Sequence, residues 1–300
     1  MKPLPRGMVQ KRARVLLHRR IAADHYLLRI HSPRAARRAE PGQFIHILCG
    51  SCGGRSHRGH PHAPEQSCFG EAFPLLRRPL SLFDADPERG FIEVIYKVVG
   101  LGTASLARVP VGARVDFLGP LGRAFQLPKK AQTVFLVGGG VGIPPLYFLA
   151  KRIERRKGQI EVFLGARTRG WVICASDFRR LGVRVGVATD DGTWGWRGSV
   201  VDLLRRRLRA RGVDGGTALS LCVCGPTPMM AAAAALARQA RIPAQVSLEE
   251  RMGCAMGCCM GCVVEVATEP VGSHARFQRV CTEGPVFDAR EILWKSTNGH

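Results

Sequence analysis

This sequence has no long apolar run and no secretory signal, and each absence excludes a class of protein. No run of about 18 apolar residues occurs, so no membrane-spanning helix is predicted. The first seven residues lack the apolar centre of a secretory signal and are interrupted by prolines, so we expect a cytoplasmic location. Hydrophobic residues nevertheless make up 46% of the chain, which is enough for packed cores.

Acidic residues are scarce. The chain has 23 Asp and Glu against 45 Lys and Arg, which gives a formal net charge of +22. The arginine-rich runs at 151–157 and 205–211 are typical of solvated helix faces or helix ends. No helix-turn-helix, RNA-binding motif or aromatic-interleaved basic groove accompanies this charge. We therefore expect no nucleic-acid partner, while an acidic protein partner stays open.

Cysteine, by contrast, is concentrated near the C-terminus. Cys254, Cys259 and Cys262 have C-x4-C-x2-C spacing and Cys281 follows, which is the ligand pattern of plant-type [2Fe–2S] sites. The backbone must turn sharply to bring three thiolates to one cluster. Glycines are placed to allow such turns: Gly253, Gly257 and Gly261. The pattern predicts a chain that carries single electrons.

Two other uses of these cysteines compete with a cluster. Disulfides need an oxidising compartment, which the missing secretory signal argues against. Zinc sites normally pair two C-x2-C knuckles about a dozen or more residues apart, and this segment has one. Cys258 as a ligand would give C-x3-C-x3-C spacing, which is not the ferredoxin pattern, so we interpret it as non-ligating.

The rest of the chain shows two successive patterns. Short alternating stretches separated by Gly and Pro predict a small β-barrel over 1–127. From 128 to 246, buried apolar strands alternate with helices, which predicts a parallel α/β nucleotide-binding domain. The cluster segment, 247–300, completes the chain.

An insertion at 49–75 interrupts the barrel pattern. It is rich in Gly, His, Ser and Pro and has no periodicity, so we interpret it as a flexible loop between two strands. The alternative is a zinc site built from its thiols and imidazoles: Cys49, Cys52, His57 or His60, and Cys68.

Two sets of residues are suited to binding nucleotides, although each piece alone could be an ordinary turn. In the first, an Arg beside a hydroxyl and a later glycine turn suit a diphosphate: Arg78, Pro79, Leu80, Ser81, Ile95, Tyr96, Lys97, Gly102 and Thr103. The second forms two strand-to-helix turns: Gly138, Gly140 and Gly142, then Cys224, Gly225 and Pro226. The first of these turns fits G-x-G-x-x-P rather than the usual G-x-G-x-x-G, and the second would face a nicotinamide.

In this order, the motifs resemble the flavin reductases related to ferredoxin–NADP reductase. Within them, the chain resembles the electron transfer subunits of class 1B dihydroorotate dehydrogenase. The likeness runs from Leu76-Arg-Arg-Pro-Leu-Ser81 through Ser247-Leu-Glu-Glu-Arg-Met252 to Val280-Cys-Thr-Glu-Gly-Pro-Val-Phe287. It covers nearly the whole chain outside 49–75.

The resemblance implies a fold, a cofactor set and a partner. FAD would bind the set that runs from Arg78 to Thr103, NAD would bind near the two strand-to-helix turns, and Cys254, Cys259, Cys262 and Cys281 would bind the cluster. The partner would be an FMN-containing catalytic chain that oxidises dihydroorotate in pyrimidine biosynthesis, in a heterotetramer of two copies each. Electrons would pass through [2Fe–2S] and FAD to NAD⁺. We find no catalytic nucleophile set worth naming.

Two other functions stay open on the sequence alone. A related NAD(P)H–ferredoxin oxidoreductase or sulfide dehydrogenase subunit would share the fold and cluster but have a different partner. A redox- or metal-sensing binding protein would use the insertion and the basic surface, and would not turn over NADH.

Overall fold

The computed structural model describes residues 9–49, 76–127, 133–155, 158–212, 219–267 and 276–294. Most of the insertion lies outside the described residues, including four of its candidate zinc ligands: Cys52, His57, His60 and Cys68. The fifth candidate, Cys49, is buried and its thiol contacts the Ile47 carbonyl at 3.8 Å. Both interpretations of the insertion, a flexible loop and a zinc site, therefore stay predictions.

The N-terminal part is the expected barrel. Six strands close in the order β1-β2-β5-β4-β3-β6, and every neighbouring pair that closes it is antiparallel. Their bounds are β1 Val9–Ala22, β2 His25–His31, β3 Phe44–Ile47, β4 Arg78–Asp86, β5 Phe91–Lys97 and β6 Arg114–Leu121. Two short helices, α1 (Pro33–Arg38) and α2 (Leu101–Ala107), accompany them. In β3, Ile45 and Ile47 join the barrel core, so the alternation of a strand turns Phe44 and His46 outward.

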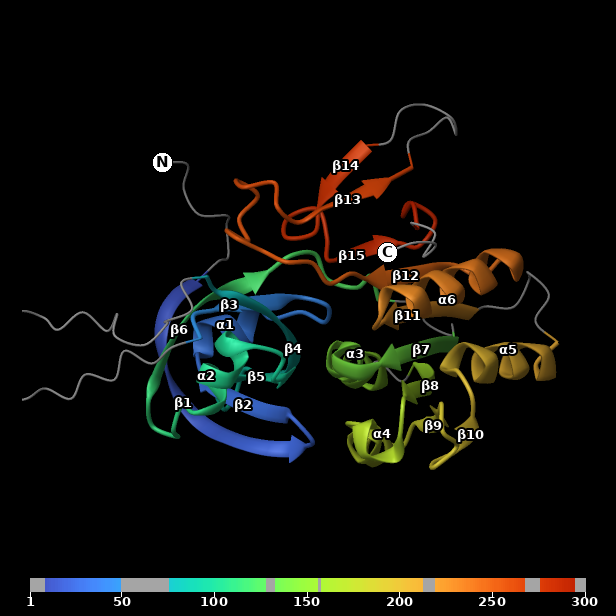
Figure 1. Cartoon of the computed structure of the whole chain (residues 1–300), viewed down its shortest axis with the longest axis horizontal. Coiled ribbons are helices and arrows are strands. Elements are labelled where there is room, and N and C mark those ends of the chain that lie inside the picture. Colours follow the sequence, from blue (N-terminus) through green and yellow to red (C-terminus); the bar gives the residue numbers. More distant parts are fainter. Residues whose placement is uncertain are drawn as a thin grey trace, which may run out of the picture.

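The second part is a seven-stranded sheet in the order β10-β9-β8-β7-β11-β12-β15. Six of its strands are parallel, as the sequence predicts: β7 Thr133–Gly139, β8 Gln159–Ala166, β9 Arg184–Thr189, β10 Trp196–Arg197, β11 Leu219–Cys224 and β12 Ala244–Ser247. Helices α3 (Ile143–Glu154) and α4 (Ala175–Arg180) cover the face toward the barrel (Figure 1). Helices α5 (Val200–Ala210) and α6 (Thr227–Gln239) cover the other face.

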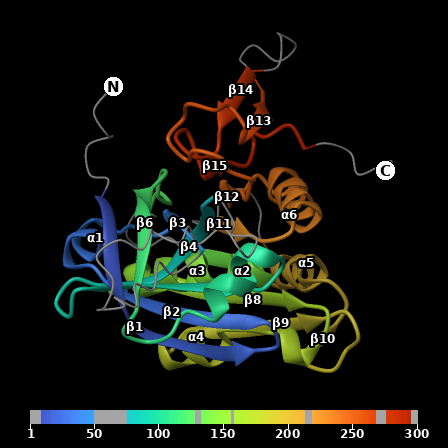
Figure 2. The same cartoon turned by 60° about the vertical axis from the view of Figure 1, so that its left-hand side comes forward.

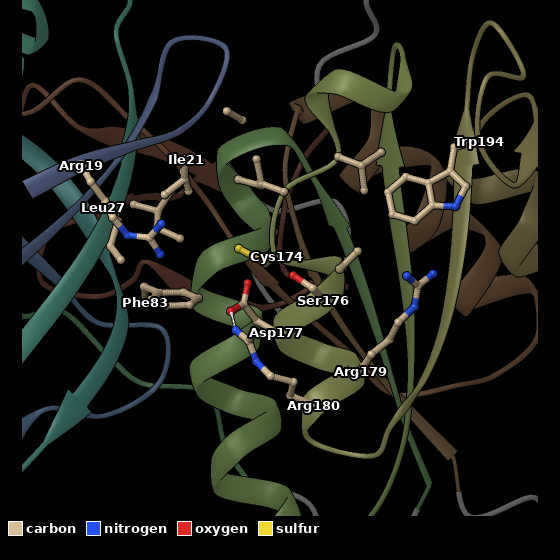
Figure 3. Close-up of a pocket in the computed structure, with 15 residues that line it drawn as sticks. Arg19, Ile21, Leu27, Phe83, Cys174, Ser176, Asp177, Arg179, Arg180 and Trp194 are labelled. Atoms are coloured by element: carbon tan, nitrogen blue, oxygen red, sulfur yellow. Dashed lines mark hydrogen bonds and ion pairs between the residues drawn. The ribbon is translucent and has the colours of Figure 1, made fainter.

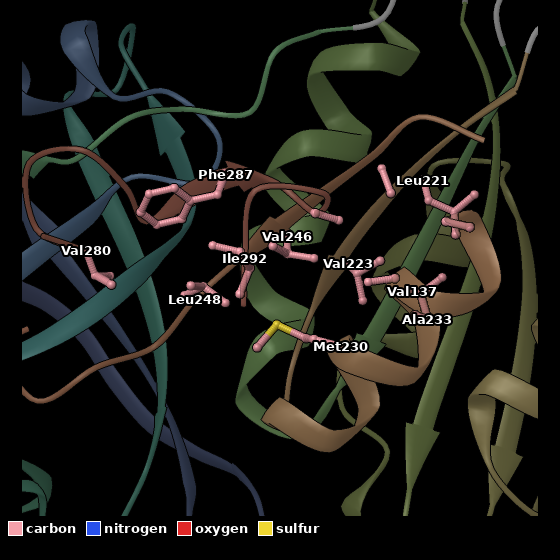
Figure 4. Close-up of a cluster of buried hydrophobic side chains, with 14 of the residues drawn as sticks. Val137, Leu221, Val223, Met230, Ala233, Val246, Leu248, Val280, Phe287 and Ile292 are labelled. Carbon is pink, nitrogen blue, oxygen red and sulfur yellow. The ribbon is translucent and has the colours of Figure 1, made fainter. Parts of the chain in front are cut away.

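The C-terminal segment is built into this sheet. Strand β15 (Val286–Asp288) pairs antiparallel with β12 at the sheet edge. Between these two strands, β13 (Val263–Val266) and β14 (Arg276–Arg279) pair in a separate two-stranded sheet, which projects away from barrel and sheet in Figures 1 and 2. The segment shares its apolar core with the α/β domain, because Val280, Phe287 and Ile292 belong to the same buried cluster as Val246 and Met230 (Figure 4). The sequence did not predict this pairing.

The barrel and the α/β domain meet along β4 and α3. The Lys151 Nζ atom of α3 lies 2.5 Å from Asp84 Oδ2 at the far end of β4. Next to this ion pair, the rings of Phe83 and Tyr147 stack with centroids 4.6 Å apart. Strand β4 and helix α3 each begin at an expected nucleotide site. The contact between β4 and α3 therefore sets the relative position of those two sites. Among the described residues, no helix combines the length and the apolar character that a membrane span needs.

Candidate functional site

The cysteine loop surrounds a thiol with backbone donors. The Cys254 sulfur accepts N–H groups from Cys258 at 3.3 Å and from Met256 and Cys259 at 3.4 Å. Partial burial opposes a thiolate at this position, but these donors outweigh it and lower the pKa of Cys254 to about 7. The Cys259 sulfur likewise accepts the Gly261 N–H at 3.5 Å. Sulfurs that accept backbone N–H groups are suited to bind metal as thiolates.

The four expected ligands influence one another in two pairs. The Cys259 thiol lowers the pKa of Cys254, and the Cys262 thiol raises that of Cys281. Cys262 and Cys281 are buried, whereas Cys259 is exposed. Burial first, and the neighbouring Cys262 thiol second, raise the pKa of Cys281 to about 12. The charge of Cys254 also raises the pKa of Cys281, so the two pairs belong to one group of thiols.

The four thiols are suited to a site with two irons. A [2Fe–2S] cluster takes two cysteines on each iron, which two pairs of thiols can supply. The arrangement therefore suits the cluster that the cysteine spacing predicts.

The turns of the loop are not where the glycines predicted them. Of Gly253, Gly257 and Gly261, only Gly257 has positive φ, whereas Ala255 (φ 56°) and Met260 (φ 55°) adopt the left-handed conformation. A Cβ at Gly253 or Gly261 would lie 3.4 or 3.5 Å from the Cys259 sulfur. Both distances are ordinary van der Waals contacts, so neither glycine is required by space. The left-handed positions fall instead on Ala255 and Met260, at a cost of about 1–2 kcal/mol of backbone strain each.

Cys258 contributes its backbone to the loop. Its N–H donates to Cys254, while its exposed thiol contacts only the Met256 carbonyl, at 3.9 Å, among the described residues. This geometry agrees with the interpretation of Cys258 as non-ligating.

The first nucleotide set is partly brought together. The guanidinium of Arg78 lies beside α2, because a Cβ at Gly102 would be 3.1 Å from Arg78 Nε. Thr103 stabilises the turn before α2. Its hydroxyl accepts the Val99 N–H at 2.9 Å and donates to the Gly100 carbonyl. Arg78 also donates to the Leu76 carbonyl at 2.6 Å, and among the described residues it has no carboxylate partner. An arginine without a carboxylate beside a helix start is suited to a phosphate.

The residues 95–97 of that set point in different directions. Tyr96 lies in the barrel core with its hydroxyl 2.8 Å from His18 Nε2. Lys97 places its ammonium 3.9 Å from the centre of the Trp171 ring, which follows β8 in the α/β domain. Ile95 faces outward into a cavity between the domains.

This cavity holds about 350 Å³ and lies between the barrel and α4. Figure 3 shows Leu27 and Phe83 on its barrel side, and Cys174, Asp177 and Arg180 on its α4 side. Asp177 and Arg180 form an ion pair with each other. Neither Arg78 nor the two strand-to-helix turns are among its lining residues, so the cavity is separate from the phosphate-binding candidates.

The two turns of the second nucleotide set lie against each other. A Cβ at Gly142 would be 2.4 Å from the Cys224 carbonyl carbon and the Gly225 nitrogen, so only glycine permits this approach. Similarly, a Cβ at Gly139 would lie 3.0 Å from Pro226 Cδ. Helix α3 begins at Ile143, because Pro144 and Pro145 fit a first turn that needs no N–H donors. The structure therefore joins the two turns into one surface at the ends of β7 and β11.

Comparisons with known proteins agree with this geometry. A family model described as the iron-sulfur cluster binding domain of dihydroorotate dehydrogenase B matches residues 249–293, and an oxidoreductase NAD-binding domain matches 136–235. The dihydroorotate dehydrogenase B (NAD(+)) electron transfer subunit of Desulforamulus reducens is 36% identical over 94% of this chain and 98% of that protein. That of Geobacillus kaustophilus is 38% identical over 95% and 98%.

The chain belongs to this family of electron transfer subunits. A solved structure of NADH-dependent reduced ferredoxin-NADP oxidoreductase is also similar, with a TM-score of 0.75 and 31% identity over 95% of this chain and 90% of that one. The expected ferredoxin reductase-like fold and the expected cofactors of this family member are confirmed: FAD, a [2Fe–2S] cluster and NAD.

Some residues around the sites were not foreseen. Arg279 and Glu283 flank Cys281 and pair with each other, and Arg279 also contacts the cysteine loop. His46 lies buried beside the lead-in to that loop. The i, i+4 spacing of Arg279 and Glu283 is a signal that the sequence does contain. His46 gives no such signal, because a histidine in a strand is usually an ordinary core or surface residue.

Proposed function

We propose that this chain is the electron transfer subunit of a dihydroorotate dehydrogenase complex and delivers electrons from a catalytic chain to NAD⁺. The observation that carries the proposal is the pairing of four cysteine thiols in a segment that shares one sheet with the nucleotide turns. The relatives that cover almost the same length are named as such subunits, which supports the same function here.

Each matched residue has a proposed task. Cys254 and Cys259 hold one iron, and Cys262 and Cys281 hold the other. Arg78 binds the FAD diphosphate, with the strand Pro79 to Ser81 and the turn at Gly102 and Thr103 beside it. Tyr96, with Ile95 and Lys97, supports the flavin from β5 through its backbone.

The nicotinamide nucleotide is assigned to the joined turns. Gly138, Gly140 and Gly142 would approach its diphosphate, and Cys224, Gly225 and Pro226 would face its nicotinamide. When bound, the cluster carries electrons singly and the flavin combines two of them into a hydride. The chain itself positions both groups and keeps their thiolate and phosphate partners in place.

The partner is expected on the cysteine loop. Cys259 and Met260 are exposed there, so a second chain can approach the ligand sulfurs closely. A cytoplasmic complex of two copies of each chain, with an FMN-containing partner, completes the proposal.

A second candidate is a subunit of a ferredoxin–NADP oxidoreductase. One observation favours it: the similar solved structure with a TM-score of 0.75 carries that description. It would keep every cofactor-binding task above and change only the partner and the electron donor.

The deciding experiment uses the native complex, purified without oxygen, and follows NADH formation. Dihydroorotate should drive NAD⁺ reduction with one orotate per NADH. Cys259→Ser should abolish this activity and lose iron, yet retain FAD and NADH oxidation by an artificial acceptor, because the flavin site lies on the barrel. Cys258→Ser is the matched control and should retain all of these.

Two results would count against the proposal. A complex inert toward dihydroorotate that exchanges electrons between NADH, NADPH and ferredoxin would establish the second candidate. Loss of the cluster in Cys258→Ser, with retention in Cys259→Ser, would show that the ligand register is wrong.

A further inference from the structure

An arginine and a glutamate on either side of Cys281 form a tight pair. Arg279 Nη2 lies 2.6 Å from Glu283 Oε1, and Arg279 Nε lies 2.9 Å from Glu283 Oε2. The Arg279 N–H also donates to Glu283 Oε2 at 2.8 Å. A two-point contact of this kind fixes the plane of a guanidinium, so the remaining nitrogen has a defined direction.

That nitrogen reaches the cysteine loop. Arg279 Nη1 donates to the Gly257 carbonyl at 2.9 Å, a contact between residues 22 positions apart. The Gly257 carbonyl and the Cys258 N–H belong to one peptide group, and the Cys258 N–H donates to the Cys254 sulfur at 3.3 Å. Carbonyl and N–H point in opposite directions across a trans peptide. One planar group therefore connects the guanidinium to a ligand sulfur.

The close approach depends on Gly257. Its φ is +81°, and a Cβ there would lie 3.3 Å from Arg279 Nη1 and 3.1 Å from Thr282 Cγ2. A side chain at this position would be strained and would also push against the guanidinium. The loop is therefore shaped to receive Arg279.

The charge of Arg279 also lies near Cys262 and Cys281, the proposed ligands of the other iron. The guanidinium is close enough to Cys262 and Cys281 to interact electrostatically with both thiols. Glu283 partly compensates that charge. A cation near the sulfurs, and hydrogen bonds to them, favour the form of a cluster that carries one more electron.

We propose that Arg279, oriented by Glu283, is a positioning residue that holds the Gly257–Cys258 peptide against Cys254 and raises the reduction potential of the cluster. The inference rests on the proposed ligand set. It assigns a role in the reaction to a residue that touches none of the reacting atoms.

The test is a redox titration of the holoprotein, followed by the electron paramagnetic resonance of the reduced cluster, with iron and FAD content measured in parallel. Arg279→Gln should lower the midpoint potential, so that the ratio of reduced to oxidised cluster at a fixed potential falls roughly tenfold, or about 59 mV. Arg279→Lys should give a smaller decrease. Glu283→Gln keeps a carbonyl oxygen that can accept from Arg279 and removes only the negative charge, so it should raise the potential.

Arg290→Gln is the matched control. Arg290 pairs with Asp288 through a similar two-point contact in the same segment, and its contacts do not include the cysteine loop. This variant should leave the potential unchanged. If all three variants of the Arg279–Glu283 pair match the parent, or if Arg290→Gln shifts the potential as much as Arg279→Gln, the inference is overturned.

Two further outcomes are decisive. If Arg279→Gln loses iron while Arg279→Lys keeps it, the result supports the role of Arg279 in holding the Gly257–Cys258 peptide. The potential of Glu283→Gln then tests whether the charge of Arg279 raises the reduction potential. If the parent protein gives no [2Fe–2S] signal, the proposed ligand set itself is wrong. If the parent gives the signal but the variants do not change the potential, only this inference is wrong.

Discussion

At the scale of single residues, the candidate sites are made as much by backbone donors as by side chains. The Cys254 sulfur accepts three N–H groups, and one of them comes from Cys258, which we interpret as non-ligating. Arg78 is the exception, because it brings a full charge to a site otherwise formed by a turn. Removing that charge should therefore have a large and specific effect.

Arg78→Ala should weaken FAD binding by roughly ten- to a hundredfold. A charge-assisted contact to phosphate commonly contributes about 1.5–3 kcal/mol, and each 1.4 kcal/mol corresponds to a factor of about ten. Flavin retained on dilution, measured by absorbance, checks this. Arg89→Ala is the control, because Arg89 lies exposed at the far end of β4. Equal flavin retention in both variants would contradict the phosphate role.

The sequence predicted these residues unequally well. Cysteine spacing alone indicated the cluster, since three thiols at fixed intervals restrict the loop strongly. The contact of Arg279 with Gly257 could not be predicted, because it joins residues 22 positions apart through a fold that only the structure gives. The left-handed Ala255 was equally invisible, since alanine usually indicates the opposite conformation.

At the scale of elements, β3 connects the barrel to the lead-in of the cysteine loop. Its residue His46 is buried, and within the described residues neither ring nitrogen has a hydrogen-bond partner. Burial, followed by the nearby charge of Arg77, lowers the pKa of His46 from 6.5 to about 4. The strand thus carries an imidazole that must stay neutral while the protein is folded.

Stability should therefore fall as the pH is lowered through this interval. The unfolded chain takes up a proton near pH 6.5 and the folded chain only near pH 4, so protonation favours unfolding between them. The loss is at most about 3–4 kcal/mol, because the pKa differs by about 2.5 units and one unit corresponds to 1.36 kcal/mol. Thermal melting of the parent and His46→Gln at several pH values checks this.

His46→Gln should show a shallower decrease in melting temperature than the parent over this range. The exposed His31 provides the control, and His31→Gln should keep the parental slope. Identical slopes for the parent and His46→Gln would mean that another group is responsible.

Most elements followed from the pattern of the sequence, and the exceptions are short. In the sequence, the apolar run at 133–137 and the alternating stretch at 91–99 each predict a strand. The structure has β7 and β5 there, each with its C-terminal end shifted by two residues. Strand β15 was missed because three residues cannot show a periodicity. Its pairing with β12 depends on tertiary packing, which the local sequence does not encode.

At the scale of the whole molecule, the flavin barrel and the nucleotide domain are joined through β4 and α3. The Lys151–Asp84 ion pair is largely buried, with side-chain exposures of 22% and 11%. Its loss would leave a carboxylate without its cation at the domain contact. The relative position of the two cofactor sites should change more than either site itself.

Lys151→Met should slow flavin reduction by NADH by roughly tenfold, with FAD and iron content near parental values. A displacement of about 1 Å can slow a reaction considerably when two bound groups must meet. Rapid-mixing measurements of flavin absorbance give the rate. Lys151→Arg, which keeps the ion pair, should remain close to the parent. A parental rate in Lys151→Met would show that the domains are held by other contacts.

One row of residues crosses the sheet from the glycine turn to the cluster segment. Gly138 is level with Cys224, Cys224 with Ser247, and Ser247 with Val286. Adjacent strands are about 4.8 Å apart, so the row spans roughly 14 Å. The segment with the cysteines leaves the sheet after Ser247 and returns before Val286. Both of its ends are therefore held by strands of the sheet. With the sites proposed above, the nicotinamide turn and the cluster segment are joined by backbone hydrogen bonds that barely stretch, whereas the flavin would be carried on a barrel held to this domain by side chains. Motion of the barrel relative to the sheet should then change the distances to the flavin and leave the span of that row constant.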